Sequence, residues 1–233
     1  MCGRKTLTCD IQSIIEELAI EQWEDLDHYT PSYNIAPTQF SPIIVQINDS
    51  RVVKAMKWGL IPSWSKDETM GAKLINARSE TILEKPSFQD LVPSNRCVVI
   101  SNGYYEWQHK GQNATKRPMY IYHSQGSLLP MAGLWSAWTS STGEELLTYT
   151  VITTTPKKNI AHIHTRMPVI LNPEDLDTWL GCDRSPVHKA ANLLVPYRGD
   201  LDFYPVSTLV NLPRNNSPEC IRPITDSSTL NMF

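Results

Sequence analysis

The residues with the clearest capacity for chemistry stand at the start of the chain, Met1-Cys2-Gly3-Arg4. If Met1 is removed, which a small second residue permits, Cys2 carries an α-amine and a thiol on adjacent carbons. Such a 1,2-aminothiol reacts with an aldehyde in two steps: the amine forms an imine, and the thiol then closes a five-membered thiazolidine ring. An α-amine has an ordinary pKa of about 7.7–8.0, so roughly a tenth of it is neutral and nucleophilic at pH 7. Taken alone, a second-position cysteine is more often a small core residue or part of a loose terminus.

Two short motifs carry further polar side chains that can serve one site. Asn76 and Arg78 are two apart, so in a strand both lie on one face; alone, the pair is more often a backbone-bonding amide and a surface ion pair. Strand alternation places Glu106 on one face with Tyr104, away from Trp107. A carboxyl flanked by aromatic rings has a raised pKa if it is buried, which suits an acid or base. The alternative for Glu106 is a position on the rim of a half-exposed strand.

His164 lies in a loop just ahead of an apolar segment, with Arg166 two residues later. Among the six histidines it is the best placed to titrate near neutral pH beside a cation. His162 is the local competitor for that role. A loop histidine on its own is more often a surface hydrogen-bonding residue.

Composition bounds the class of protein. A chain of 233 residues with 41% hydrophobic and 19% charged residues predicts one soluble, intracellular domain without a membrane span. The formal net charge of -3 means that nucleic acid, if it binds, needs a local basic groove. The five scattered cysteines predict neither a disulfide framework nor a zinc site, so we expect no metal and no cofactor. They are Cys2, Cys9, Cys97, Cys182 and Cys220.

Hydrophobic patterning predicts a single α+β domain dominated by antiparallel strands. An apolar face at Ile11, Ile14, Ile15 and Leu18 predicts a helix capped by Asp10 or Thr8. A hairpin is expected over 42–58 around the turn 48–50, with Trp58 in the core and Trp64 exposed. Segment 29–41 is typical of a connecting loop. A strand at 96–100, an Asn102-Gly103 turn and a strand at 104–107 follow one another. The remaining predicted strands are 118–122, 131–135 and 147–154, and capped helices are expected at 172–175 and 187–195.

Six short motifs run in series along most of the chain. They are Met1-Cys2-Gly3-Arg4, Tyr33-Asn34-Ile35-Ala36-Pro37, Trp58-Gly59-Leu60-Ile61-Pro62-Ser63-Trp64, Ile75-Asn76-Ala77-Arg78-Ser79-Glu80-Thr81, Gly103-Tyr104-Tyr105-Glu106-Trp107 and His164-Thr165-Arg166-Met167-Pro168. Each is weak alone, but their order resembles the SRAP family, the SOS-response-associated peptidase-like proteins that crosslink to abasic sites in DNA. The resemblance implies an SRAP domain over 2–222 with a mainly antiparallel, barrel-like sheet and peripheral helices, followed by a polar tail at 223–233.

The resemblance also implies roles for single residues. Cys2 matches the residue that joins to DNA, Asn76 the asparagine that holds the reacting terminus, Glu106 the active-site glutamate, and His164 the histidine that acts on the sugar. The positions that match phosphate contacts or stacking residues are Arg4, Asn34, Pro37, Trp64, Arg78, Thr153 and Arg166. Some relatives have a second aromatic residue after Trp64, where this chain has Ser65, so stacking there is expected to be weaker.

The chemistry available at Cys2 agrees with that assignment. An abasic deoxyribose equilibrates with a ring-opened aldehyde, which accepts an amine; an unstacked lesion favours single-stranded DNA as the partner. Two alternatives stay open. Cys2 can instead attack an acyl group with His164 as base, as a hydrolase or peptidase, and removal of residues ahead of it would be a limited form of that activity. A non-covalent reader of single-stranded or modified DNA would use Trp64 and the arginines alone.

The DNA damage response that the resemblance implies also suggests an oligomeric state and a cellular location. We expect a monomer that is cytoplasmic and nucleoid-associated if the chain is bacterial or from a phage, and nuclear if it is eukaryotic. The lyase character of an imine and the covalent protein–DNA linkage are the activities that the resemblance implies.

Overall fold

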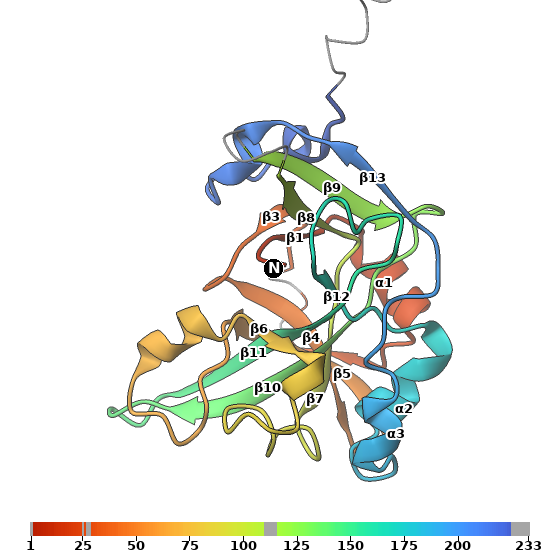
Figure 1. Ribbon diagram of the computed structural model, residues 1–233. Helices are drawn as coiled ribbons and strands as arrows, with labels where there is room; N and C mark the ends of the chain where they lie inside the picture. The colour runs from red at the N-terminus through yellow and green to blue at the C-terminus, as the bar shows by residue number, and fades with distance from the viewer. Residues whose placement is uncertain (1, 25, 27–28, 110–115, 225–233) are drawn as a thin grey trace, which may run out of the picture.

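A computed structural model describes residues 2–24, 26, 29–109 and 116–224, and its strands form two sheets. The smaller sheet has the order β13-β9-β8-β1-β3. Its strands are β13 (Leu201–Pro205), β9 (Arg117–His123), β8 (Gly103–Gln108), β1 (Lys5–Leu7) and β3 (Ser32–Ile35). Figure 1 shows this sheet above the larger one, with β1 close to the centre of the molecule.

The larger sheet closes into a five-stranded barrel. Its strand order is β12-β11-β10-β7-β4-β5-β2, and β11 also pairs in parallel with β5, which joins the two ends of the path β11-β10-β7-β4-β5. These strands are β12 (Met167–Pro168), β11 (Glu145–Thr154), β10 (Met131–Thr139), β7 (Arg96–Val99), β4 (Phe40–Ile47), β5 (Ser50–Trp58) and β2 (Gln22–Trp23). Strand β6 (Asn76–Arg78) adds to the edge of β11 beyond β5. The predicted α+β class with a barrel-like, mainly antiparallel sheet is therefore confirmed.

The predicted hairpin is the β4–β5 pair, with Ile47 opposite Ser50. Its two turn residues, Asn48 and Asp49, have positive φ angles of 47° and 68°. A two-residue turn with both φ angles positive matches the twist of the strands, and asparagine and aspartate tolerate that conformation well. Trp58 at the end of β5 is buried and stacks on Tyr149 at 6.0 Å between ring centroids, as the sequence predicts for a core residue.

Helices lie at the periphery, as Figure 1 shows. Helix α1 (Ile11–Leu18) begins after Asp10, whose side chain accepts a hydrogen bond from the backbone N–H of Ser13 and is therefore the N-cap. It buries Ile14 and Leu18. The others are α2 (Leu176–Leu180), α3 (Val187–Ala191) and the short 3-10 helices η2 (Glu68–Lys73), η3 (Ser79–Thr81), η4 (Pro173–Asp175), η5 (Thr208–Asn211) and η6 (Pro218–Ile221). Helix α3 ends before the expected residue 195.

Two predicted features differ in the structure. Strands β7 and β8 do not pair across the Asn102-Gly103 turn, because β7 belongs to the barrel and β8 to the smaller sheet. The turn carries the chain from one sheet to the other, and the side chain of Asn102 holds it against β1 by bonding Thr6 and Thr8. The expected loop 29–41 contains the strand β3 and the start of β4, so part of it is sheet.

The end of the described chain packs on the smaller sheet. Cys220 is buried, Pro223 bridges to Val206, and the N–H of Ile224 donates to the carbonyl of Pro205. The polar tail expected at 223–233 thus has its first two residues paired with the end of β13, and 225–233 lies outside the described residues. In the part of the chain that is described, no helix is long and apolar enough to cross a membrane.

Candidate active site

Cys2 lies inside the molecule, immediately ahead of β1. Its side chain is fully buried. The carbonyl of Arg4 accepts a hydrogen bond from the N–H of Tyr105, so pairing with β8 begins two residues after Cys2 and fixes its direction. The expected removal of Met1 concerns a residue outside the described ones. The cysteine is therefore held by sheet pairing and does not belong to a loose terminus.

Asn76 connects β6 to the cysteine. Its Nδ2 donates to the backbone carbonyl of Cys2 at 2.8 Å. Its Oδ1 is buried and has no hydrogen-bond partner among the described residues. Because buried acceptors are nearly always paired, this oxygen is suited to receive an N–H from a reacting amine.

Glu106 and His164, the expected acid and base, lie next to each other. Nδ1 of His164 lies 3.6 Å from Oε1 of Glu106. Glu106 is only 2% exposed, and burial raises its pKa to about 7, as expected for a buried carboxyl. Burial lowers the pKa of His164. Nδ1 of His164 lies 3.0 Å from the backbone nitrogen of Arg166 and 3.1 Å from its carbonyl oxygen, so the backbone of Arg166 fixes the orientation of the ring.

The thiol of Cys2 is protonated at neutral pH. Burial and the nearby Glu106 carboxyl raise its pKa to about 12. A thiol in this state needs a proton acceptor before its sulfur can form a bond. A pocket of about 350 Å³ opens beside Glu106 and His164 and is also lined by Trp107, His109 and Lys116. The site thus has an opening to solvent with two basic side chains at its edge.

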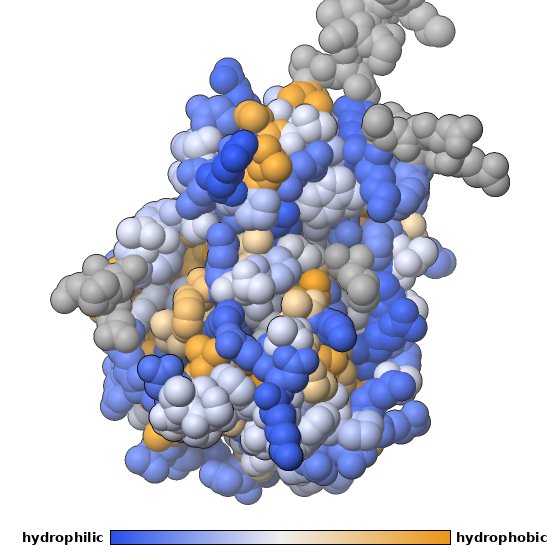
Figure 2. All heavy atoms as spheres, turned by 90° about the vertical axis from the view of Figure 1, so that its left-hand side faces the viewer, coloured by the Kyte–Doolittle hydropathy of each residue, from blue (hydrophilic) through white to orange (hydrophobic). Residues whose placement is uncertain are grey.

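The residues expected to contact DNA fall into two groups. Trp64 (59% exposed) and Arg78 lie on the surface, and Pro37 is half-buried. Figure 2 shows hydrophobic patches across the middle and near the top of the face it presents, interspersed with hydrophilic side chains. These three positions have surface available for a strand, and their contacts with DNA stay predictions.

The other four positions are engaged inside the protein. Thr153 is buried on β11 between β6 and β12. Arg166 makes two hydrogen bonds to the carboxylate of Glu80 and donates to Thr153. For Arg166 to contact a phosphate, the phosphate must therefore replace the Glu80 carboxylate. The DNA contacts expected of Thr153 and Arg166 stay predictions.

Arg4 and Asn34 clasp the C-terminal segment to the site. Arg4 donates to Oδ1 of Asn34 and to the carbonyl of Val210, and its guanidinium lies 5.8 Å from the ring centroid of Trp107. Nδ2 of Asn34 lies 2.7 to 3.2 Å from the carbonyl oxygens of Val210, Leu212 and Asn215. Both side chains are buried, so the geometry gives them a structural role, and their contact with DNA stays a prediction.

Sequence reasoning missed a second group of buried polar residues, on β1, β4 and β8. Lys5 and Ser41 are buried and hydrogen-bonded to each other, and the hydroxyl of Tyr104 is buried without a partner among the described residues. The only signal in the sequence is a lysine that starts a short strand, which ordinarily indicates a solvent-facing residue. Within the described ranges, no group of three or more His, Cys, Asp and Glu side chains is arranged to hold a metal ion.

The fold and the site together define an α+β domain that keeps its N-terminal cysteine in the interior. Over residues 1–213 the chain matches the model of the SOS response associated peptidase (SRAP) family, and it belongs to that family. It is 43% identical over 222 residues to the abasic site processing protein YoqW of Bacillus subtilis (strain 168), covering 95% of this chain and 99% of the relative. It is 34% identical over 270 residues to the abasic site processing protein HMCES of Mus musculus, covering 96% and 76% of the two chains.

A solved structure supports the same fold. The crystal structure of a protein from Bacteroides thetaiotaomicron matches with a TM-score of 0.85 and 29% identity, covering 96% of this chain and all of the other. The family suggested by the six sequence motifs is therefore confirmed.

Proposed function

We propose that this chain processes abasic sites by binding single-stranded DNA and joining covalently to the ring-opened sugar through Cys2. The names of its relatives support abasic site processing as the general role. The observation that carries the finer proposal is the meeting of Cys2 with Asn76, Glu106 and His164, contributed by four separate segments. An aminothiol beside an acid, a base and an amide acceptor has each group that aldehyde capture needs.

The first stage is capture of the aldehyde by the amine. His164 and Glu106 move a proton from the anomeric hydroxyl to the ring oxygen, which opens the sugar. Once Met1 is removed, the Cys2 amine adds to the aldehyde carbon, oriented by Oδ1 of Asn76, which has no hydrogen-bond partner among the described residues. Loss of one water then gives the imine. A carboxyl with a pKa of about 7 can donate and accept protons near neutrality, so Glu106 can serve both directions of this transfer.

The second stage closes the ring. The Cys2 sulfur bonds to the imine carbon, the electron pair of the C=N bond moves to nitrogen, and the thiol proton ends on that nitrogen. No electrons are lost or gained overall. Closure removes the imine, which otherwise promotes β-elimination and strand cleavage, so the thiol converts a lyase-type intermediate into a stable adduct.

Single-strand preference follows from the need for an unstacked lesion. Exposed Trp64 supplies a stacking surface, and Arg78 supplies a cation on the same side of β11 as Asn76. Initial binding is therefore expected to weaken as salt rises.

The test uses purified protein with confirmed loss of Met1 and a single-stranded oligonucleotide with one abasic site. We expect a denaturation-resistant band whose mass is the sum of both partners less one water. Cys2→Ala and a form that retains Met1 serve as controls and should give no such band. Cys2→Ser should give only an adduct that depends on borohydride trapping, with increased strand cleavage.

Other outcomes decide against the proposal. A Cys2→Ser variant that forms a heat-stable adduct as well as the wild type contradicts ring closure. Wild-type binding without any change in mass, unaffected by Cys2→Ala, indicates a non-covalent reader. Cleavage of peptides in trans that requires Cys2 indicates a hydrolase.

A further inference from the structure

An ion pair between Glu80 and Arg166 joins η3 to the loop that carries His164. Nη1 of Arg166 lies 2.5 Å from Oε1 of Glu80, and Nη2 lies 2.9 Å from Oε2. Two parallel hydrogen bonds of this kind are the strongest arrangement of an arginine and a carboxylate. The hydrogen bond from Arg166 lowers the pKa of Glu80, so the carboxylate is charged at neutral pH. In the free protein, the charge of Arg166 is therefore balanced by Glu80.

Arg166 has a second anchor that does not involve Glu80. Its Nη2 donates to the carbonyl oxygen of Thr153 and lies 3.3 Å from the hydroxyl oxygen of the same residue. Thr153 is fully buried on β11, so this anchor is part of the sheet. The side chain of Arg166 is 14% exposed, whereas that of Glu80 is 46% exposed. The arginine thus belongs to the wall of the protein, and the glutamate covers it from the solvent side.

The position of this pair relative to Cys2 follows from the strand register. Arg78, at the end of β6, is opposite Thr153 of β11, so Arg78 and Arg166 both lie beside Thr153. Asn76, which donates to the carbonyl of Cys2, begins the same strand. Two residues of a strand span about 7 Å, so a phosphate next to a sugar bound at Cys2 lies within reach of the two arginines.

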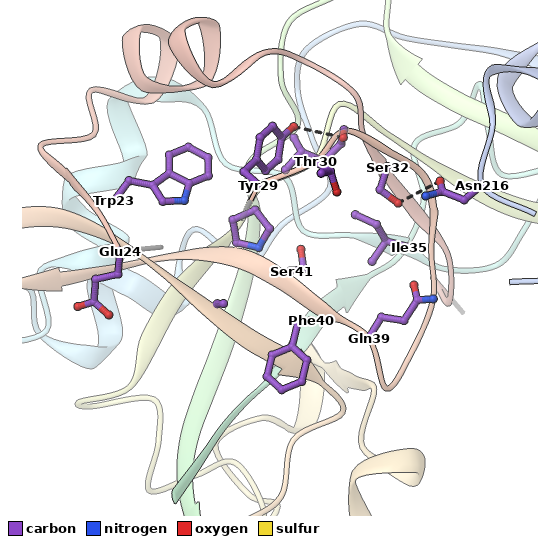
Figure 3. A pocket seen from close by; sticks show the side chains of 13 residues that line it. Trp23, Glu24, Tyr29, Thr30, Ser32, Ile35, Gln39, Phe40, Ser41 and Asn216 are labelled. Carbon is purple, nitrogen blue, oxygen red and sulfur yellow. Dashed lines mark hydrogen bonds between the residues drawn. The ribbon is translucent and has the colours of Figure 1, made fainter. Parts of the chain in front are cut away.

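The pocket of about 380 Å³ shown in Figure 3 offers no comparable place for a phosphate. Its lining is apolar, aromatic and uncharged polar, and among the described residues it contains neither lysine nor arginine. Its charged residue is Glu24, an anion. An anionic strand is drawn to positive charge, so the arginines beside Thr153 are the better-placed partners for it.

We propose that Glu80 occupies the place of a DNA phosphate on Arg166 and restricts binding at that arginine to a strand that displaces it. A carboxylate and a phosphate engage the same pair of N–H groups of a guanidinium, so one of them holds that edge at a time. When the phosphate takes the edge, the contacts with Thr153 keep the guanidinium in position. The inference rests on the proposed function, because it concerns how a single strand binds next to Cys2.

Displacement of the carboxylate sets the sign of the effect. In the wild type, a strand meets no net charge from the pair and must first break it. An exposed ion pair is weak enough for a phosphate to replace it, but breaking it still lowers the affinity. Removal of the Glu80 charge should therefore tighten binding. If Glu80 only positioned Arg166 for the strand, its removal would weaken binding instead.

The experiment measures binding of a labelled single-stranded oligonucleotide without an abasic site by fluorescence anisotropy, at about 50 to about 200 mM salt. Glu80→Gln removes the charge at equal size, and Glu84→Gln removes the same charge from an exposed glutamate four positions later. We expect Glu80→Gln to bind about fivefold more tightly than the wild type, the factor that an exposed ion pair contributes. Its plot of log affinity against log salt should be steeper by about 0.7, since one more phosphate is neutralised. Glu84→Gln should bind as the wild type does.

A double-mutant cycle with Arg166→Gln tests whether the gain passes through the arginine. In the Arg166→Gln background, Glu80→Gln should bring no gain, because no guanidinium is released. A gain of equal size with and without Arg166 overturns the proposal, since it would come from the loss of a negative charge near the strand. Should Arg166→Gln fail to fold by circular dichroism, Glu80→Asp decides. It keeps the charge on a shorter side chain that reaches Arg166 less well, so it should bind more tightly than the wild type, and equal affinity overturns the proposal.

Equal or weaker binding by Glu80→Gln also overturns the proposal. Adduct formation on an abasic oligonucleotide, measured in parallel, separates it from the proposed function. If the wild type binds the strand but forms no adduct, the covalent proposal fails and the comparison of Glu80 variants still stands. If the wild type forms the adduct and Glu80→Gln binds no more tightly, only the role of Glu80 fails. If the wild type binds no single strand, DNA binding fails and the role of Glu80 fails with it.

Discussion

Replacement of Glu106 by glutamine should change how stability depends on pH. Burial raises the pKa of Glu106 from 4.5 to about 7. As pH rises, the unfolded chain loses this proton from about pH 4.5, whereas the folded protein keeps it until about pH 7. The unfolded state therefore binds fewer protons in this window, and the free energy of unfolding falls with rising pH. With about 1.36 kcal/mol per pKa unit, the full loss is about 3 kcal/mol, of which about 2.5 kcal/mol falls between pH 5 and pH 8.

Glutamine keeps the shape of the side chain and cannot ionise, so Glu106→Gln should not show this loss. We expect the difference in unfolding free energy between Glu106→Gln and the wild type to become more favourable to the variant by about 2.5 kcal/mol from pH 5 to pH 8. Urea denaturation at both pH values measures it, with Glu144→Gln as a control at an exposed glutamate. A difference that changes by less than about 0.5 kcal/mol would show that Glu106 is already ionised in the folded protein at pH 5, and the acid role assigned to it would fall.

Three further variants test other parts of the site. His164→Asn should slow adduct formation by about 10²–10⁴-fold in single-turnover gels while leaving the initial binding of DNA unchanged; equal rates would remove His164 from the chemistry. Trp64→Ala should weaken single-stranded DNA binding by about 1–3 kcal/mol in fluorescence anisotropy, with no loss of stability because the ring is 59% exposed; unchanged affinity would place the strand elsewhere. Asn34→Ala should lower the free energy of unfolding by about 2–3 kcal/mol in urea, because it leaves buried carbonyls of the 210–215 segment unpaired; a change below about 0.5 kcal/mol would contradict the clasp.

Local patterns predicted the elements whose pairing is local. The β4–β5 hairpin and α1 follow from alternation, turn residues and a cap that lie within a few positions of each other. The Asn102-Gly103 turn carried the same local signal but does not join paired strands. Strand β8 pairs with β1 and β9, and the competition among these partners is settled by burial between sheets, which a local pattern does not contain.

The residues of the site also divide into those that the sequence indicated and those that it did not. Glu106 and Asn76 were ambiguous as single residues and became candidates through motifs in series, and the structure places both beside Cys2. The clasp of Arg4 to Val210 joins positions 206 apart in sequence, so no spacing rule indicates it. Lys5 was missed for a different reason: a lysine in a strand predicts exposure, and a functional interior is where such a rule is expected to fail.

The interior of the protein holds two ionisable side chains, Glu106 and Lys5, whose burial costs stability. Burial raises the pKa of the acid and lowers that of the amine until both are about 7. The acid destabilises the fold increasingly as pH rises from 4.5 to 7, and the amine destabilises it below 7 and progressively less as pH rises towards 10.5, so their combined penalty is largest near neutrality. That is also where each group is about half protonated. The proposed opening of the sugar needs a group whose proton affinity matches the pH, and Glu106 would provide it at a cost in stability.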